Sequence, residues 1–354
     1  MQNVFWTTLV QRLTPYVPGE QRHGDDIVKL NTNENPYPPS DDVLSALKQV
    51  DGDALRRYPD PESVELRRSL AQYHGLDVSQ VFVGNGSDEI LALSFMAFFT
   101  NGQALQYPKI SYSFYPVYCD LLEIEKQVHP LLADFSINMS AFTDNRGGII
   151  FPNPNAPTSL AEPASAIEAL LERVPNTLVL VDEAYVDFGA QSVVELINRY
   201  PNLVVSQTFS KSRSLAGMRL GAAFANPSLI EALSRVKNSF NSYPVDAVAQ
   251  RAGVASISDK AYFQQTMQRV IATRNDTSKA LRSRGFQVLD SAANFIFVSP
   301  KDGNAASLFD KLNRHGVLVR YWGTDELAAW LRISIGTEAD MQKLLDVIDK
   351  VESA

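Results

Sequence analysis

The feature that most constrains the fold is an alternation of short apolar runs with helical patterns between about residues 80 and 240. The apolar runs lie at 81–83, 103–107, 148–151, 177–181, 203–206 and 220–225. Several are apolar at consecutive positions, which is typical of strands buried on both faces of a parallel sheet. Helical patterns over 87–99, 162–172 and 190–199 lie between several of them. This alternation predicts an α/β domain with a mostly parallel sheet.

The segments on either side predict a second, smaller unit. Residues 14–39 are rich in proline and predict an extended arm, and helices are expected to begin near Ser40 and Pro61. After about residue 240, a long helical stretch over 244–284 precedes strand-like runs and helices over 304–315 and 338–351. A length of 354 residues fits roughly two domains, and this second part predicts an α+β domain.

Composition excludes several classes of protein. The chain is 45% apolar and 20% charged, as in ordinary globular proteins. Its net charge of −8, without a basic block, argues against nucleic acid or an anionic membrane as a partner. The single cysteine, Cys119, excludes a disulfide framework and is expected to be a buried small hydrophobe. The scattered histidines predict no metal site, and the lack of a signal peptide or membrane span predicts a cytoplasmic protein.

Candidate ligand-binding residues follow the predicted strands, because ligands bind beyond the carboxyl ends of strands in open α/β sheets. The segment 84–89, Gly-Asn-Gly-Ser-Asp-Glu, follows the first run and leads into a helix. Free N–H groups at a helix N-terminus suit a phosphate, although a turn that only caps the helix is an alternative. Asp182 follows the run 177–181. A carboxylate at the end of a buried strand is costly unless it has a polar or charged partner. Asp182 is therefore expected to cap a helix, to pair with an arginine or to bind a ligand.

A lysine follows the next strand. Lys211 lies between Ser210 and Ser212, with Arg219 eight residues further on. A lysine in such a turn is either a solvated charge or a reactive amine beside a phosphate. A reactive lysine, a carboxylate on a neighbouring strand and an anion cradle are together what pyridoxal phosphate requires, since the lysine forms a Schiff base with its aldehyde and the carboxylate keeps its ring nitrogen protonated.

The chain resembles the fold-type I pyridoxal-phosphate aminotransferases over nearly its whole length and, within them, the histidinol-phosphate aminotransferases. The most specific match is Ser-Lys-x-x-x-Leu-Ala-Gly-x-Arg-x-Gly at 210–221. The other matching segments are 30–40, 57–61, 84–89, 110–115, 151–159, 181–188, 317–322 and 331–337. The resemblance implies a mostly parallel seven-stranded sheet between helices. It also implies an N-terminal arm with part of the small domain (1–40), a large cofactor-binding domain (41–242) and a small α+β domain (243–354).

The resemblance also implies roles for individual residues in binding pyridoxal 5′-phosphate and the substrate. Lys211 is the Schiff-base lysine and proton shuttle, Asp182 pairs with the ring nitrogen, and Tyr185 is a catalytic donor to the phenolic oxygen. The further cofactor contacts are Asn155 at the phenolic oxygen, Tyr112 on the ring face, and Asn85, Gly86, Ser87, Thr208, Ser210 and Arg219 at the phosphate. Tyr58 reaches the phosphate from the partner subunit, which implies a homodimer.

The resemblance also implies that arginines bind the substrate, because a guanidinium binds a carboxylate or phosphate bidentately. Arg332 resembles the arginine for the substrate carboxylate and Arg320 a second anion-binding arginine, with surface salt bridges as the alternative for both. Asn35, Tyr16 and Tyr243 either line the substrate pocket or pack in the core and the arm. One loop departs from the family: Asn155-Ala156-Pro157-Thr158-Ser159 stands where Asn-Asn-Pro-Thr-Gly is usual, so its shape and the contact at Asn155 are expected to differ.

The implied activity is transfer of an amino group between a small-molecule amino donor, L-histidinol phosphate, and a 2-oxo acid acceptor, 2-oxoglutarate, by ping-pong kinetics. Three alternatives stand beside it. These are an aminotransferase for aromatic or other amino acids, a decarboxylase of a phosphorylated amino acid, and a catalytically silent binding or regulatory module.

Overall fold

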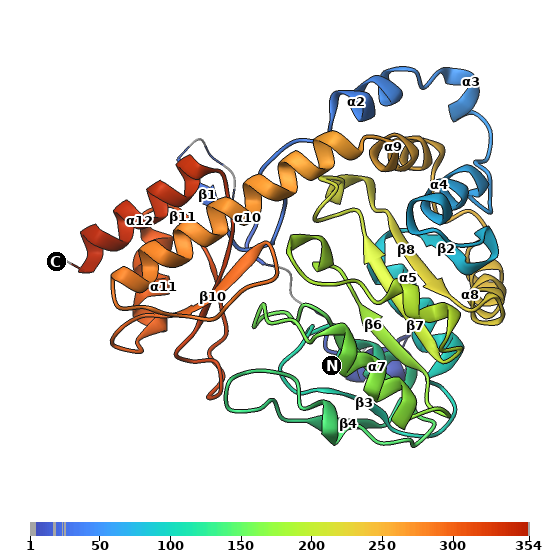
Figure 1. Cartoon of the computed structure of the whole chain (residues 1–354), viewed down its shortest axis with the longest axis horizontal. Helices are drawn as coiled ribbons and strands as arrows, with labels where there is room; N and C mark the ends of the chain where they lie inside the picture. Colours follow the sequence, from blue (N-terminus) through green and yellow to red (C-terminus); the bar gives the residue numbers. More distant parts are fainter. Residues whose placement is uncertain (1–4, 17–18, 23, 25, 353–354) are drawn as a thin grey trace.

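The computed structural model (Figure 1) describes residues 5–16, 19–22, 24 and 26–352. The other positions of the predicted N-terminal arm and the last two residues of the predicted C-terminal domain lie outside these ranges. Over the described ranges the chain forms a seven-stranded, a four-stranded and a two-stranded sheet. We call the seven-stranded sheet with the helices packed on it the large unit. The other two sheets with their helices are the small unit.

The large sheet has the order β2-β8-β7-β6-β5-β3-β4. Its strands are β2 (Val81–Gly84), β3 (Leu105–Pro108), β4 (Lys126–His129), β5 (Ile149–Pro152), β6 (Val179–Asp182), β7 (Leu203–Thr208) and β8 (Gly221–Ala225). All pairings are parallel except the two that β8 makes with β2 and β7. The predicted α/β fold with a mostly parallel seven-stranded sheet is confirmed. The sequence does not predict β4, because this edge strand is largely exposed and its residues show no apolar run.

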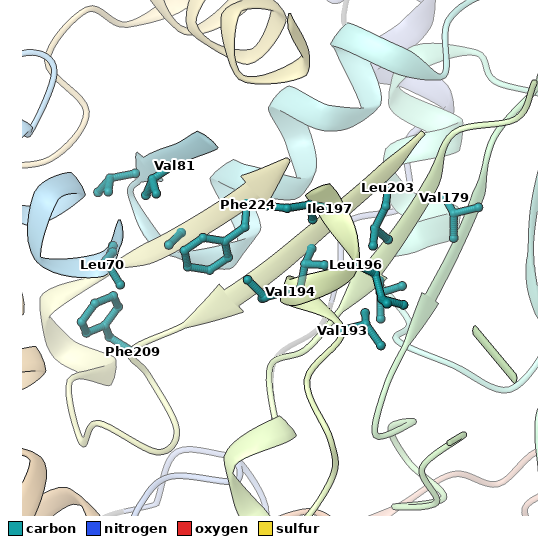
Figure 2. Packing of buried hydrophobic residues seen from close by; sticks show 14 of the residues in the cluster. Leu70, Val81, Val179, Val193, Val194, Leu196, Ile197, Leu203, Phe209 and Phe224 are labelled. Carbon is teal, nitrogen blue, oxygen red and sulfur yellow. The ribbon is translucent and has the colours of Figure 1, made fainter. Parts of the chain in front are cut away.

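Helices cover both faces of the large sheet. In β6, Val179 and Val181 pack in one core cluster and Leu180 in the other, because successive strand side chains point to opposite faces. The first cluster, shown in part in Figure 2, includes α2 (Asp41–Lys48), α4 (Val64–His74), α7 (Ala164–Arg173) and α9 (Ala247–Ser258). The second includes α5 (Gly86–Phe98), α6 (Tyr115–Leu122) and α8 (Pro227–Phe240). Burial on both faces therefore explains the uninterrupted apolar runs.

Several helices differ from the pattern in the sequence. The stretch 244–284 forms two helices, because Asp259 ends α9 and its side chain accepts from Tyr262 N to begin α10 (Lys260–Ser283). The segment 190–199 forms only the 3-10 helix η4 (Val194–Asn198). Helix α2 begins at the expected position, with Ser40 as its N-cap accepting from Val43 N, and Cys119 is buried and free. The remaining short helices are α1 (Thr8–Arg12), α3 (Gly52–Leu55), η1 (Val78–Gln80), η2 (Met139–Ala141), η3 (Val186–Phe188) and η5 (Ala216–Met218).

The small unit packs around an antiparallel sheet of order β12-β13-β10-β9. Its strands are β9 (Gln287–Val288), β10 (Phe295–Ser299), β12 (Arg320–Tyr321) and β13 (Leu331–Ser334). The helices α10, α11 (Ala305–Arg314) and α12 (Glu338–Glu352) share its core, and in Figure 1 α10 extends from beside α9 to this unit. The arm joins it through β1 (Val28–Lys29), which pairs with β11 (Val317–Leu318).

The division of the chain into domains stays a proposal. Two observations support an arm that belongs to the small unit: β1 pairs with β11, and Val28 and Leu30 lie in the small unit's core. Helix α9 packs against α2 and α4 in the large unit. We therefore propose that the large unit continues past residue 243 to the end of α9. No helix among the described residues is long and apolar enough to cross a membrane.

Candidate active site

A cavity of about 580 Å³ lies at the carboxyl ends of the central strands, with walls from both units. Asp182 and Thr208 are the last residues of β6 and β7, and Arg320 and Arg332 belong to β12 and β13 of the small unit. Most of the predicted site residues line this cavity: Tyr16, Ser87, Tyr112, Asp182, Tyr185, Thr208, Ser210, Lys211, Arg219, Arg320 and Arg332. The structure thus brings together residues that are far apart in the sequence.

Strand register places the start of α5 beside the loop that carries Lys211. Gly221 at the start of β8 is opposite Gly84 of β2 on one side and Thr208 of β7 on the other. A Cβ on Gly221 would lie 2.5 Å from the Gly86 carbonyl carbon and 2.7 Å from Ser87 N, so glycine is required for this close approach. Gly86 has φ +80°, and a Cβ there would lie 2.8 Å from Arg219 Nη2. The result is a concave surface at a helix N-terminus, which suits a phosphate.

Arg219 reaches this surface but is partnered by a residue that the sequence analysis does not single out. Its Nη2 lies 3.1 Å from Asp88 Oδ2, and Tyr112 OH donates to Asp88 Oδ1 at 3.0 Å. Asp88 therefore holds the predicted phosphate arginine and the predicted ring-stacking tyrosine in one network. The motif at 84–89 contains this carboxylate, but only the fold shows which residues it contacts.

Asp182 is buried at the end of β6, and its carboxylate accepts three hydrogen bonds. Tyr115 OH donates to its Oδ2 at 3.2 Å, and Ser206 Oγ and Ala184 N donate to its Oδ1 at 3.3 and 3.2 Å. Burial raises the pKa of Asp182 to about 6, although these hydrogen bonds act in the opposite direction. A buried carboxylate with this raised pKa is suited to a cationic partner in the cavity.

Lys211 projects into the cavity from the loop between β7 and β8. Its Nζ donates to the carbonyl oxygen of Thr32 at 3.1 Å. Burial lowers the pKa of Lys211 to about 8, and the positive charge of Arg332 acts in the same direction. The loop is held by Asn35, whose Nδ2 donates to the carbonyl oxygens of Lys211 and Ser212 at 3.0 and 3.2 Å. The lysine is therefore a desolvated amine and not a solvated surface charge.

Two arginines on the small unit form a positively charged wall of the cavity. The guanidinium carbons of Arg320 and Arg332 lie 5.5 and 5.4 Å from the ring centroid of Trp322. Arg332 is enclosed: its Nη2 donates to Asn31 O at 2.7 Å, and its buried Nε has no hydrogen-bond partner in the ranges that the structure describes. Within the described part of the chain, neither arginine is paired with a carboxylate. Uncompensated cations at this wall indicate an anionic ligand.

Other predicted residues do not line the cavity. Asn35 holds the lysine loop, and Asn85 Nδ2 donates to Pro244 O at 2.8 Å. Asn155 Nδ2 donates to Ile110 O and Thr158 Oγ1 at 3.0 and 3.1 Å, and its buried Oδ1 has no partner. Tyr58 stacks on Tyr243 with ring centroids 4.6 Å apart, outside the cavity. Gly86 shapes the surface without a side chain, and the expected ligand contacts of these residues stay predictions.

The loop 155–159, whose sequence departs from that of the family, has a backbone conformation at Ser159 that favours glycine. Ser159 stands at φ +66°, in the left-handed region. Its N donates to Asn155 O at 2.7 Å, and its carbonyl oxygen accepts from Ala292 N at 2.9 Å. These bonds hold a non-glycine residue in an uncommon conformation.

The N-terminal arm supplies contacts that sequence reasoning missed. Asn33 Nδ2 donates to Tyr185 OH at 3.0 Å, and the carbonyl oxygens of Asn31 and Thr32 accept from Arg332 and Lys211. All three lie in the motif at 30–40. The two carbonyl contacts use backbone atoms and do not depend on which side chain stands at these positions, so only the fold reveals them.

Comparisons with known proteins agree with this site. Residues 25–348 match the family of aminotransferase class I and II. The chain is 50% identical over 340 residues to histidinol-phosphate aminotransferase 1 of Hydrogenovibrio crunogenus, covering 96% of each chain. It is 50% identical to the histidinol-phosphate aminotransferase of Chromohalobacter salexigens, covering 98% of this chain and 99% of that one. It is similar to the crystal structure of histidinol-phosphate aminotransferase from Sinorhizobium meliloti in complex with pyridoxal-5′-phosphate, with a TM-score of 0.87 and 25% identity over 99% of each chain.

The fold and the site thus define an aminotransferase. The chain belongs to the aminotransferase class I and II family, and the expected family, fold class and enzyme class are confirmed.

The close approach at Gly221 generates a first prediction. Gly221→Ala should weaken binding of pyridoxal 5′-phosphate by about tenfold or more, because its Cβ would push the start of α5 away from the Lys211 loop. Gly52→Ala is the control, since a Cβ there has nothing within 4 Å. Cofactor titration followed by absorbance measures both. Equal affinity in the two variants would contradict the proposed role of this contact.

The lowered pKa of Lys211 generates a second prediction. Unfolded lysine titrates near 10.4, so between about pH 8 and this value the folded protein binds fewer protons at Lys211 than the unfolded chain. The contribution of Lys211 to stability should therefore become more favourable as the pH rises. In cofactor-free protein, the free energy of unfolding of the wild type relative to Lys211→Met should increase by about 2 kcal/mol between pH 7.5 and 9.5. Urea titrations measure it, and a difference independent of pH would refute the assignment.

Proposed function

We propose that this chain is a pyridoxal-phosphate-dependent aminotransferase of histidine biosynthesis, which exchanges an amino group between L-histidinol phosphate and 2-oxoglutarate. The relatives that share about half of its residues carry this name over nearly their full length. The observation that carries the proposal is the wall of unpaired Arg320 and Arg332 in the same cavity as a desolvated lysine, Lys211, and a buried carboxylate, Asp182. Both proposed substrates bring an anionic group to such a wall.

The residues present fit pyridoxal 5′-phosphate. The concave surface at α5 requires glycine at positions 86 and 221, and it is flanked by Ser87, Thr208, Ser210 and Arg219, which would hold the phosphate. Asp182 would face the ring nitrogen, and Tyr112 and Tyr185 would contact the ring. When bound, the cofactor supplies an aldehyde that reacts with amines and a ring that accepts an electron pair.

The chain's own groups account for proton transfer and orientation. Because its pKa is lowered to about 8, roughly a tenth of Lys211 is uncharged at pH 7, far more than for an ordinary lysine, so its Nζ can take the proton from the amine-bearing carbon of the substrate. Asp182, which is buried and ionised above about pH 6, would stabilise positive charge on the ring nitrogen of the bound cofactor. Asn33 fixes the Tyr185 hydroxyl through its 3.0 Å hydrogen bond.

Arg332 can serve both half-reactions. A guanidinium fork matches either a phosphate or a carboxylate, so the same side chain can orient the phosphate of the amine donor and a carboxylate of the oxo acid. Its buried Nε, which has no hydrogen-bond partner among the described residues, supplies a donor for this purpose. Using one arginine for both substrates is compatible with a ping-pong reaction, because the two substrates bind in turn.

A third prediction tests substrate and cofactor together. L-histidinol phosphate should remove the visible absorption band of the bound cofactor, and 2-oxoglutarate should restore it. Lys211→Ala should abolish turnover, whereas Lys279→Ala, which alters an exposed lysine of α10, should retain it. A band shifted only by phenylalanine or another amino acid would indicate a different aminotransferase, and release of carbon dioxide would indicate a decarboxylase. Absence of any cofactor band after incubation with pyridoxal 5′-phosphate would refute the proposal.

We further propose a homodimer in which Tyr58 completes the partner's site. Tyr58 and Tyr243 are both exposed large hydrophobic residues, and Tyr58 is 81% exposed. Tyr58 stacks on Tyr243, and the next residue, Pro244, accepts the hydrogen bond from Asn85 beside the start of α5. This exposed pair of tyrosines therefore adjoins the concave surface without lining the cavity of its own subunit, which supports a shared site. A cytoplasmic location and the lack of nucleic-acid and membrane partners stay predictions.

A fourth prediction tests this arrangement by mixing inactive subunits. Tyr58→Ala and Lys211→Ala should each be inactive at limiting cofactor. Subunits co-refolded in equal amounts should regain about a quarter of wild-type activity, because about half of the dimers are hybrids and one of the two sites in each hybrid is intact. Sedimentation measures the dimer and an activity assay measures the recovery. If Tyr58 acts within its own subunit, no hybrid site is intact and no activity returns.

A further inference from the structure

The two units meet around the cavity in two ways. An exposed ion pair between Lys109 and Glu326 lies at the rim, and a buried hydrogen-bond network lies beside the cavity floor. Exposed ion pairs contribute little, whereas a fully satisfied buried network fixes the geometry of its members. This network contains Ser334 of β13 in the small unit, Asn33 of the arm, and Tyr185, which follows β6 of the large unit.

Asn33 is buried, and each of its polar groups forms a hydrogen bond. Its N donates to Ser334 Oγ at 2.8 Å, and Ser334 Oγ donates to Asn33 Oδ1 at 2.8 Å. Its carbonyl oxygen accepts from Asn294 Nδ2 at 2.9 Å, and its own Nδ2 donates to Tyr185 OH at 3.0 Å. Its backbone has φ +56°, a conformation that asparagine tolerates. The backbone and the amide of Asn33 are therefore both held in place.

Ser334 decides which end of the Asn33 amide faces Tyr185. The Ser334 hydroxyl is buried and has a single hydrogen, and in the described part of the chain Asn33 Oδ1 is its acceptor. With the amide reversed, this hydrogen would face an NH2 group, and a buried donor without an acceptor is costly. The Nδ2 end of the amide is therefore held towards Tyr185.

This orientation determines what the Tyr185 hydroxyl can do. A hydroxyl that accepts from an amide nitrogen cannot donate its own hydrogen to that nitrogen, which has no free lone pair. Tyr185 lines the cavity, and no residue in the described ranges accepts its hydrogen. The hydrogen is thus left for a ligand. A reversed amide would present Asn33 Oδ1 instead, which would accept the hydrogen and withdraw it from the ligand.

We propose that Ser334 is a positioning residue for the cofactor: by orienting the Asn33 amide, it directs the Tyr185 hydroxyl hydrogen towards the phenolic oxygen of pyridoxal 5′-phosphate. Ser334 is two residues from Arg332, so both side chains lie on the same face of β13, and both contact the arm. One strand of the small unit thus carries an arginine proposed to bind substrate anions and a serine that sets a cofactor contact. This inference rests on the proposed aminotransferase function.

The absorption spectrum of the bound cofactor tests this inference without an activity assay. The visible band changes with pH as the proton between Lys211 Nζ and the phenolic oxygen is lost, and a donor to that oxygen makes this proton easier to remove. Ser334→Ala should therefore raise the pH midpoint of the change by about 0.5–1 pH unit, the effect of one neutral hydrogen bond. Tyr185→Phe should raise it at least as much, and Ser334→Thr, which keeps the hydroxyl, should leave it close to the wild-type value.

A double-mutant cycle separates positioning from packing. If Ser334 acts through Tyr185, Ser334→Ala should cause no further rise in a Tyr185→Phe background. Asn33→Asp, whose carboxylate can only accept from the tyrosine, gives a second variant that should raise the midpoint more in the wild type than in that background. If Ser334 only packs in the small unit, the midpoint should stay unchanged or should change equally in both backgrounds, and the inference is wrong.

Ser299→Ala is the matched control. Ser299 is a buried serine of β10 in the same sheet, and its hydroxyl donates to Pro300 O and not to the arm. Its replacement should leave the midpoint unchanged, and a rise equal to that of Ser334→Ala would contradict the inference. Failure of the wild type to show any cofactor band would instead refute the proposed function.

Discussion

The structure depends on the common alignment of strand ends in the centre of the large sheet. Strands β5, β6 and β7 are parallel, so Pro152, Asp182 and Ser206 are in register, and the loops that follow them open on one edge. Strand β8 returns antiparallel, which brings Gly221 against both Thr208 and Gly84. This register, together with the absence of a side chain at Gly221, places a helix N-terminus beside the lysine loop.

Burial then gives the aligned groups their chemical character. The same desolvation raises the pKa of Asp182 and lowers that of Lys211, because it disfavours the charged form of each group. Arg332 adds to the effect on Lys211 through its positive charge. The arginine proposed to bind substrate anions therefore also helps to keep the lysine uncharged, which links anion binding to the state of the amine.

The N-terminal arm connects the small unit to the side chains that line the cavity. It pairs with β11 through β1 and then passes along the cavity, where Asn31, Thr32 and Asn33 contact Arg332, Lys211 and Tyr185. Asn35 holds the backbone of the lysine loop. One short extended segment thus sets the positions of side chains from both units, so motion of the small unit relative to the large one would be transmitted to the lysine.

The sequence by itself determined the alternation of strands and helices, the family, and the residues with a distinctive side chain in a local motif, such as Lys211, Asp182 and Arg219. These follow from short-range patterns: consecutive apolar residues, a turn rich in hydroxyls, a glycine before a helix. Only the tertiary structure decided that Asp88 pairs with Arg219, that backbone carbonyls of the arm accept from Lys211 and Arg332, and that Lys109 meets Glu326 across the rim. All of these contacts join residues more than a hundred positions apart, and two of them use backbone atoms that every residue possesses. No local pattern encodes such contacts, because their partners are set by strand register and by the packing of one unit against the other.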